Sequence, residues 1–217
     1  MTEGIFITFE GGDGSGKTTQ VQYLRNRLRR RRIPVRTVRE PGGTPLGNKL
    51  RTLLKFSNVD MIPETEMLLF YASRIQLVRD VISPSLSRGE VIICDRFADS
   101  TFAYQGYGRS IPVNKIETIH NAVLENIKPD ITIFLDLLPS EGIKRRNTSR
   151  DRFERGLEDQ NMMDLHGRVR QGYMELASRE PNRWLIIDAA QSKRAVSNKI
   201  WQSIEPKIHR LTDKIVG

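Results

Sequence analysis

Residues 5–18 read IFITFEGGDGSGKT, an apolar run followed at once by a glycine-rich turn. The turn matches G-x-x-x-x-G-K-[ST], the spacing of a phosphate-binding loop. The match is specific because it lies between a predicted strand, residues 5–9, and a predicted helix that begins near Lys17. This segment therefore predicts an α/β protein that binds a nucleoside triphosphate at the start of its first helix.

The loop indicates a nucleoside triphosphate and Mg²⁺ as ligands. Its glycines let the backbone approach phosphates closely, and the helix N-terminus points free N–H groups at them. We expect Lys17 to bridge the β- and γ-phosphates and Thr18 to place its hydroxyl on Mg²⁺. The residues expected to contact the ATP phosphates are Gly11, Gly12, Asp13, Gly14, Ser15, Gly16, Lys17 and Thr18. The loop does not identify the reaction, because kinases, GTPases, helicases and motor ATPases all use it.

Five short apolar runs predict the strands of one sheet: 5–9, 35–38, 91–94, 131–135 and 185–187. They are apolar on both faces, which is typical of a parallel sheet covered by helices on both sides. All but the weak second run are followed by an acid: Glu10, Asp95, Asp136 and Asp188. These carboxylates are expected at the carboxyl edge of the sheet, where open α/β sheets bind ligands.

Helices are predicted at 17–31, 47–55, 64–86, 113–126, 140–147, 156–178 and 192–213. Residues 144–159 crowd basic and acidic side chains with almost no apolar content, as expected of a solvated lid. At 217 residues, the chain is expected to form one domain over residues 1–217.

The net charge of +9 predicts an anionic partner, which is nucleic acid, a membrane surface or a phosphorylated small molecule. There is no secretion signal at the N-terminus, and no apolar stretch approaches the ~20 residues of a spanning helix. We therefore expect a cytoplasmic protein. The single cysteine, Cys94, lies in an apolar run and is expected to be buried.

Charged residues near the predicted sheet edge favour a phosphorylated acceptor. Asp13 lies inside the loop, where a carboxylate beside a triphosphate is unfavourable unless it serves a second ligand or the metal. An irregular proline- and glycine-rich segment adds Glu40, and Arg51 follows in the next helix. Asp95 is placed to reach Mg²⁺ through water, and Arg96 offers a bidentate clamp for an acceptor phosphate.

A second group has the chemistry to bind a base and a sugar. Phe70 and Arg74 are four residues apart on a predicted helix and share a face, which places a ring beside a fork of donors. Spacing alone favours a different interpretation, a ring in the core with a solvated arginine nearby. The polar side chains that follow Arg96 supply donors and acceptors: Ser100, Thr101, Tyr104 and Gln105.

In order and spacing, five segments together resemble the bacterial thymidylate kinases: 9–20, 39–45, 95–97, 100–106 and 151–154. The resemblance covers nearly the whole chain. It implies transfer of the γ-phosphoryl of ATP to dTMP, giving dTDP and ADP for dTTP synthesis. It also implies a P-loop NTPase fold with a five-stranded parallel sheet, helices on both faces and a mobile lid, and a homodimer.

The resemblance also implies roles for the acceptor residues. Phe70 is similar to the residue that stacks on thymine, Arg74 to the one that bonds its carbonyl, and Arg51 and Arg96 to the phosphate clamp. Thr101 and Gln105 resemble the pair that reads the base, and Tyr104 the ring that disfavours ribonucleotides. Asp13 and Glu40 resemble carboxylates that meet the 3′-hydroxyl or the metal and its waters.

The resemblance also bears on the transition state. One subdivision of the family has an arginine directly after the loop aspartate, where this chain has Gly14. The cations that stabilise the transferring group are then expected from the lid, with Arg150 and Arg152 as candidates. Catalysis would rest on Lys17, Arg96, Mg²⁺ and positioning, without a general base.

Three alternatives stay open at this point. In the first alternative, the protein is a kinase for a different acceptor, either another deoxynucleotide or a deoxynucleoside. Arg51 and Arg96 favour a phosphorylated acceptor. A nucleic-acid-stimulated ATPase would account for the positive charge, but the sequence has no aromatic RNA-binding signature and no helicase-like second domain. A non-catalytic nucleotide sensor is disfavoured because acceptor and lid residues are present. The expected small-molecule partners are ATP and dTMP, and no nucleic acid or membrane partner is expected.

Overall fold

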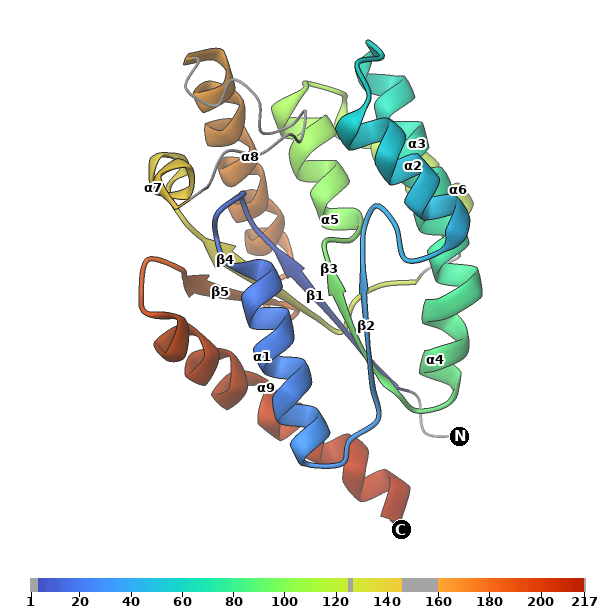
Figure 1. Cartoon of the computed structure of the whole chain (residues 1–217), viewed down its shortest axis with the longest axis vertical. Helices are drawn as coiled ribbons and strands as arrows, with labels where there is room; N and C mark the ends of the chain where they lie inside the picture. The colour runs from blue at the N-terminus through green and yellow to red at the C-terminus, as the bar shows by residue number, and fades with distance from the viewer. Residues whose placement is uncertain (1–3, 125–126, 146–159, 217) are drawn as a thin grey trace.

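The computed structural model describes residues 4–124, 127–145 and 160–216, which form a parallel sheet with helices on both faces (Figure 1). The strands are β1 (Ile5–Glu10), β2 (Val35–Arg39), β3 (Val91–Asp95), β4 (Ile131–Asp136) and β5 (Trp184–Asp188). They lie in the order β2-β3-β1-β4-β5, and each neighbouring pair is parallel. The five predicted strands and the predicted fold class are therefore confirmed.

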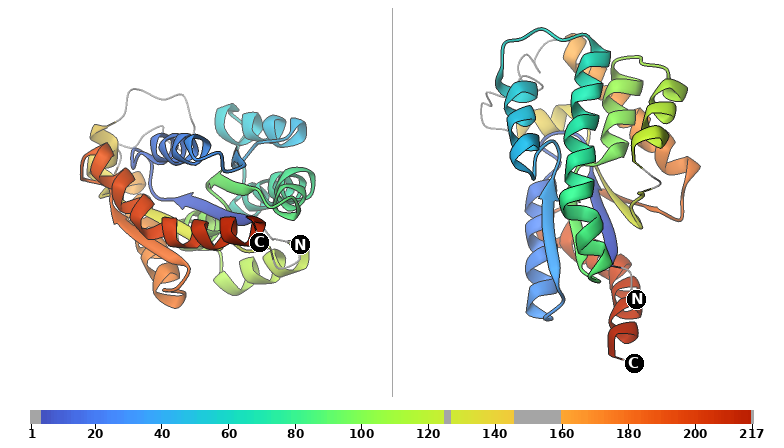
Figure 2. Two further views of the ribbon diagram at one scale, coloured as in Figure 1. Left: turned by 90° about the horizontal axis from the view of Figure 1, so that it is seen from below. Right: turned by 90° about the vertical axis from the view of Figure 1, so that its right-hand side faces the viewer.

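The predicted helices are present, with ends that differ by a few residues wherever the structure describes them. The helical elements are α1 (Lys17–Arg30), α2 (Pro45–Phe56), α3 (Pro63–Leu77), η1 (Val78–Ile82), α4 (Ser83–Ser87), α5 (Ala98–Thr101), η2 (Phe102–Gly108), α6 (Val113–Val123), α7 (Pro139–Lys144), α8 (Gln160–Arg179) and α9 (Lys193–Val216). The right-hand view of Figure 2 shows α3, η1 and α4 as one unbroken rod.

One helical segment, formed by α5 and η2, was not predicted from the sequence. The α-helical part is only four residues long, and η2 is a π-helix whose wider turns break the 3.6-residue spacing of an apolar face. The segment is held by packing against α8, which lies far away in the sequence. It carries several of the side chains expected to bind the acceptor.

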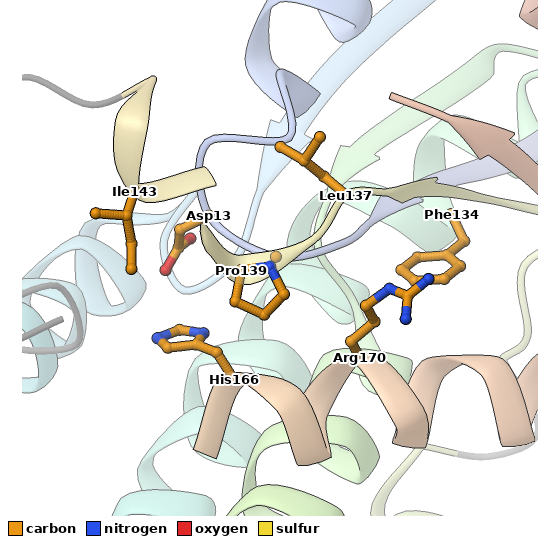
Figure 3. A pocket seen from close by; sticks show the side chains of 8 residues that line it. Asp13, Phe134, Leu137, Pro139, Ile143, His166 and Arg170 are labelled. Carbon is orange, nitrogen blue, oxygen red and sulfur yellow. The ribbon is translucent and has the colours of Figure 1, made fainter. Parts of the chain in front are cut away.

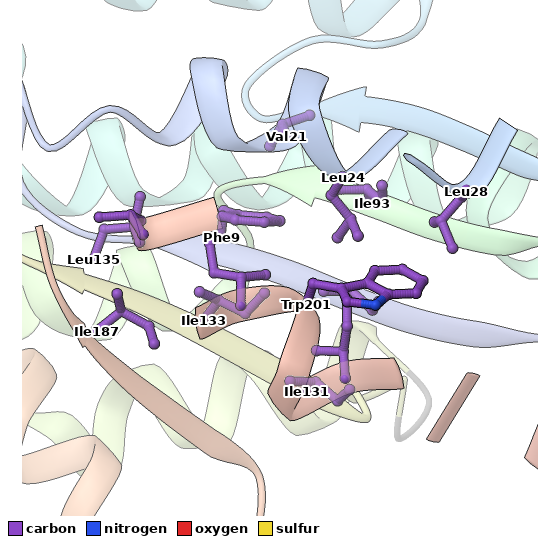
Figure 4. Packing of buried hydrophobic residues seen from close by; sticks show 14 of the residues in the cluster. Phe9, Val21, Leu24, Leu28, Ile93, Ile131, Ile133, Leu135, Ile187 and Trp201 are labelled. Carbon is purple, nitrogen blue, oxygen red and sulfur yellow. The ribbon is translucent and has the colours of Figure 1, made fainter. Parts of the chain in front are cut away.

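Side chains of β1 point alternately into two cores, as the period of a strand requires. Ile7 and Phe9 pack with α1 and α9 (Figure 4), where Leu28 and Trp201 are buried. Phe6 packs on the opposite face, in the cluster formed with α3 and α6. The central strand is therefore buried on both sides, which fixes the positions of the loops at its carboxyl end.

The carboxyl edge of the sheet collects the predicted functional segments. Because β1 lies between β3 and β4, the phosphate-binding loop that follows β1 sits beside Asp95 and Arg96 at the end of β3. Glu40 directly follows β2, the next strand out. No helix in the described part of the chain is long and apolar enough to cross a membrane.

Candidate active site

The phosphate-binding loop turns at Gly16, which has a φ of 90°. Gly16 directly precedes Lys17, the first residue of α1. The buried Nζ of Lys17 donates to the carbonyl oxygens of Gly11 at 3.0 Å and Gly12 at 2.8 Å. Burial, followed by the charge of Arg96, lowers the pKa of Lys17 to about 7. Phosphate oxygens would favour the charged ammonium again, so this lysine is suited to a polyanionic ligand.

Gly14 lets the loop pack directly against α7. Its φ is 73°, and a Cβ built on it would lie 2.3 Å from the carbonyl oxygen of Gly142. A Cβ on Gly142 would lie 2.4 Å from the carbonyl oxygen of Asp13. The two backbones therefore touch through a pair of glycines, and this contact leaves no room for an arginine at position 14.

Thr18 and Asp95, both expected near the metal, lie in contact. The Thr18 hydroxyl donates to Asp95 Oδ2 at 2.8 Å. The contact joins the first turn of α1 to the carboxyl end of β3, directly beside the loop. A hydroxyl next to a carboxylate is the oxygen donor set that Mg²⁺ takes in nucleotide sites, where phosphates and water complete its shell.

Arg96 is bound from several sides. It has a left-handed backbone with a φ of 69°, and its Nη2 donates to Asp13 Oδ1 at 2.7 Å and to the Tyr104 hydroxyl at 3.2 Å. Its Nη1 donates to Ser100 Oγ and to the Tyr173 hydroxyl, both at 3.3 Å. These contacts hold the guanidinium in one position against the phosphate-binding loop.

Glu10 binds two of the side chains that contact Arg96. Its carboxylate accepts from the backbone N–H of Phe97 at 2.7 Å, from Ser100 Oγ at 2.5 Å and from the Tyr173 hydroxyl at 2.9 Å. Burial, then the charge of Asp99, raises the pKa of Glu10 to about 7 although Arg96 opposes the shift. The sequence placed Glu10 at the sheet edge without a role, and it gave no signal for Tyr173 on α8.

Arg74 lies deeper than the sequence predicted. It is 1% exposed, and its Nε donates to Glu40 Oε2 at 2.7 Å. Its Nη1 donates to Thr101 Oγ1 at 3.0 Å and its Nη2 to the Phe97 carbonyl at 3.2 Å. Arg74 and Glu40 therefore form a buried ion pair. Arg74 contacts the wall of the site through its hydrogen bond to Thr101.

Two adjoining cavities share Asp13, Lys55 and Arg96. The larger cavity follows the phosphate-binding loop and the start of α1, and Glu40 and Arg51 line its far wall. The smaller cavity is lined by Asp13, Pro41, Lys55, Phe70, Arg96, Ser100, Thr101, Tyr104 and Gln105. The structure thus brings together most of the residues predicted to bind a second ligand, and it adds Lys55, which the sequence analysis missed.

A further hollow lies on the other side of Asp13, between the loop, α7 and α8 (Figure 3). Its walls are mostly apolar, with His166 and Arg170 on α8. Arg170 binds both carboxylate oxygens of Asp136, at 2.6 Å and 2.8 Å. Figure 3 shows these side chains around the hollow, which shares Asp13 with the two joined cavities.

Arg150 and Arg152, together with most of the predicted lid, lie outside the described residues. The last described residue before them, Arg145, lines the larger cavity and donates to the carbonyl oxygen of Ala189 at 2.8 Å.

Comparison with known proteins places these features in one family. A family model described as "Thymidylate kinase" matches residues 9–200. The chain is 43% identical to a thymidylate kinase of Roseiflexus over 218 residues, covering 96% of both proteins. It is also 43% identical to one of Deinococcus radiodurans, covering 96% of this chain and all of that one. The solved thymidylate kinase of Ehrlichia chaffeensis has a TM-score of 0.76, is 34% identical, and is matched over 94% of this chain and 99% of that one.

The raised pKa of Glu10 predicts a specific dependence of stability on pH. The ordinary value is 4.5, so between pH 4.5 and 7 the folded protein holds a proton that the unfolded chain has lost. The free energy of unfolding should therefore fall as pH rises through this window. For Glu10→Gln, urea unfolding at pH 5 and pH 8 should show a fall smaller than the wild-type fall by roughly 3 kcal/mol.

Glu117→Gln is the matched control, because Glu117 is exposed on α6. It should retain the wild-type pH dependence. Equal pH dependence in Glu10→Gln and the wild type would show that Glu10 does not hold the proton.

Proposed function

The chain belongs to the thymidylate kinase family, and from this premise we propose that Asp13 and Arg96 mark the point where its two substrates meet. The protein is a phosphotransferase that moves the γ-phosphoryl of ATP to dTMP, giving dTDP and ADP. The observation that carries the proposal is that the two cavities share the Asp13 and Arg96 side chains. The phosphate-binding loop lines the cavity on one side of this pair, and Phe70 lines the cavity on the other side.

The loop binds the triphosphate of ATP in the larger cavity. Lys17 exchanges its two carbonyl partners for phosphate oxygens, and the N–H groups at the start of α1 face the same phosphates. When bound, Mg²⁺ neutralises charge that develops on the transferring phosphoryl group. The residues placed to hold it are Thr18 directly and Asp95 through water, and the 2.8 Å contact between them supports this assignment.

The phosphate of dTMP binds against Arg96 in the smaller cavity. Arg96 presents its guanidinium there, and Arg51, which donates to the Pro41 carbonyl at 3.1 Å, faces the same region from the larger cavity. An oxygen of the acceptor phosphate then attacks the γ-phosphorus in line, and the bond between that phosphorus and the β-bridging oxygen breaks. No base is needed, because the acceptor phosphate is already an anion.

The base of dTMP lies against Phe70, with Thr101 and Gln105 on the polar wall. Tyr104 lies beside the sugar, where its ring disfavours a 2′-hydroxyl. Arg74 acts by holding Thr101 in place, and it reaches the base only through that contact. Glu40 contributes by pairing with Arg74 from the wall of the larger cavity.

Arg150 and Arg152 remain our candidates for the cations that stabilise the transferring phosphoryl group. Asp13 remains our candidate for the carboxylate that contacts the 3′-hydroxyl of the dTMP sugar. We further propose that residues 1–217 form one domain and that the protein is a cytoplasmic homodimer, as the family resemblance implies. The net charge of +9 suits two anionic substrates, so we propose no partnership with nucleic acid or membranes.

Arg96→Lys tests the acceptor phosphate site. Lysine keeps one charge but loses the fork that holds several oxygens together, so kcat/KM for dTMP should fall about 100-fold. KM for ATP should change less than about threefold, because the donor contacts come from the loop. Coupled detection of ADP measures both. Arg36→Lys, on the exposed side of β2, is the control and should behave as wild type. An unchanged kcat/KM in Arg96→Lys would exclude the assignment.

Asp95→Asn tests the metal site. The amide retains the shape but loses the charge that attracts the hydrated ion, so the Mg²⁺ concentration for half-maximal rate at saturating ATP should rise about tenfold. Asp80→Asn, an exposed change on η1, should leave it unaltered. If both variants need the same Mg²⁺ as wild type, Asp95 does not serve the metal.

A further inference from the structure

We propose that Glu66 is a positioning residue that fixes the orientation of the Gln105 amide and thereby makes the site accept a base with an N3–H and reject cytosine. The proposal rests on the proposed function, in which Gln105 lies on the polar wall of the base pocket. It goes beyond that function because Glu66 does not line the pocket.

The contact that carries the proposal is buried. Glu66 is 1% exposed and Gln105 is 2% exposed, and Gln105 Nε2 donates to Glu66 Oε1 at 2.8 Å. The other oxygen of Glu66, Oε2, accepts from Arg109 Nη2 at 3.2 Å. Glu66 lies on α3, whereas Gln105 belongs to the π-helix η2. The hydrogen bond therefore joins two different helical elements, α3 and η2.

The chemistry of a carboxylate sets the direction of the amide. An ionised carboxylate only accepts hydrogen bonds, so the NH₂ group of Gln105 must face Glu66. The Arg109 guanidinium, 3.2 Å from Oε2, places a second donor on the other oxygen of the same carboxylate. Rotating the amide by 180° would place its oxygen against the carboxylate and break a buried hydrogen bond. Oε1 is therefore the amide atom of Gln105 that is turned away from Glu66, on a residue that lines the smaller cavity.

An acceptor at this position distinguishes pyrimidines by polarity. Thymine presents N3–H as a donor, whereas cytosine presents N3 as an acceptor and an amino group in place of the neighbouring carbonyl. Oε1 can accept from the thymine N3–H, but it faces a lone pair on cytosine N3. A site built to pair with one polarity rejects the other because buried polar groups are then left without partners.

Glu66→Gln tests this inference. A glutamine at position 66 can donate from its own amide, so Gln105 can rotate and turn its NH₂ group toward the base. The substrates to compare are dTMP and 5-methyl-dCMP, which keep the same methyl group and differ only at the 4-position and N3. In wild type, kcat/KM should favour dTMP by at least about 1,000-fold. In Glu66→Gln this ratio should fall by at least about 30-fold, through both a lower value for dTMP and a higher one for 5-methyl-dCMP.

The control is Glu64→Gln, on the same helix, where the side chain is 42% exposed and pairs with Lys115 at 3.3 Å. It should keep the wild-type ratio. A purely structural role for Glu66 would lower both rates together and leave the ratio unchanged, and that result overturns the inference. If Glu66→Gln does not fold, Arg109→Gln replaces it. Without the guanidinium, Oε2 of Glu66 loses its hydrogen bond from Arg109, and the carboxylate holds the Gln105 amide less firmly. The ratio should then fall by at least about threefold, and an unchanged ratio again overturns the inference.

The wild-type measurements separate this inference from the proposed function. A wild-type enzyme that phosphorylates 5-methyl-dCMP as well as dTMP would contradict the proposed role of Gln105 itself. A wild-type preference for dTMP that is retained in Glu66→Gln would leave the proposed function intact and contradict only the role of Glu66.

Discussion

The ion pair between Arg96 and Asp13, 2.7 Å long, joins the two halves of the site. Asp13 belongs to the loop that follows β1, and Arg96 follows β3, so the contact exists only because these strands are parallel neighbours. The left-handed backbone of Arg96 turns its side chain toward the loop. The pocket lined by Phe70 is thereby attached directly to the phosphate-binding loop, and the sheet sets the distance between these two parts of the site.

Glu10 and Lys17 are both buried close to this pair. Glu10 accepts three hydrogen bonds under Arg96, while Lys17 is held by carbonyl oxygens of its own loop. Burial moves the pKa of both Glu10 and Lys17 to about 7, from opposite directions. Without nucleotides, both groups are therefore close to changing their charge at neutral pH. Phosphate oxygens beside Lys17 would raise its pKa again and favour the ammonium form. A bound phosphate would therefore supply the negative charge that the buried Lys17 lacks in the protein alone.

Local patterns in the sequence predict much of this molecule. The apolar runs identify the strands, and the loop around Lys17 is recognisable by its spacing alone. What the sequence missed depends on contacts between distant segments. Tyr173 reaches Glu10 across 163 positions, and no local pattern marks either side chain for that bond. Arg74 was placed on the correct helix, but only the packed structure shows that it turns inward to Glu40.

The structure of the protein with dTMP bound would test the central claim most directly. We expect an oxygen of the dTMP phosphate at about 3 Å from a guanidinium nitrogen of Arg96, with the pyrimidine ring against Phe70. The phosphate would then face the loop that holds Lys17. A complex in which dTMP binds elsewhere, while Arg96 keeps only its contacts to Asp13 and the surrounding hydroxyl groups, would contradict the account.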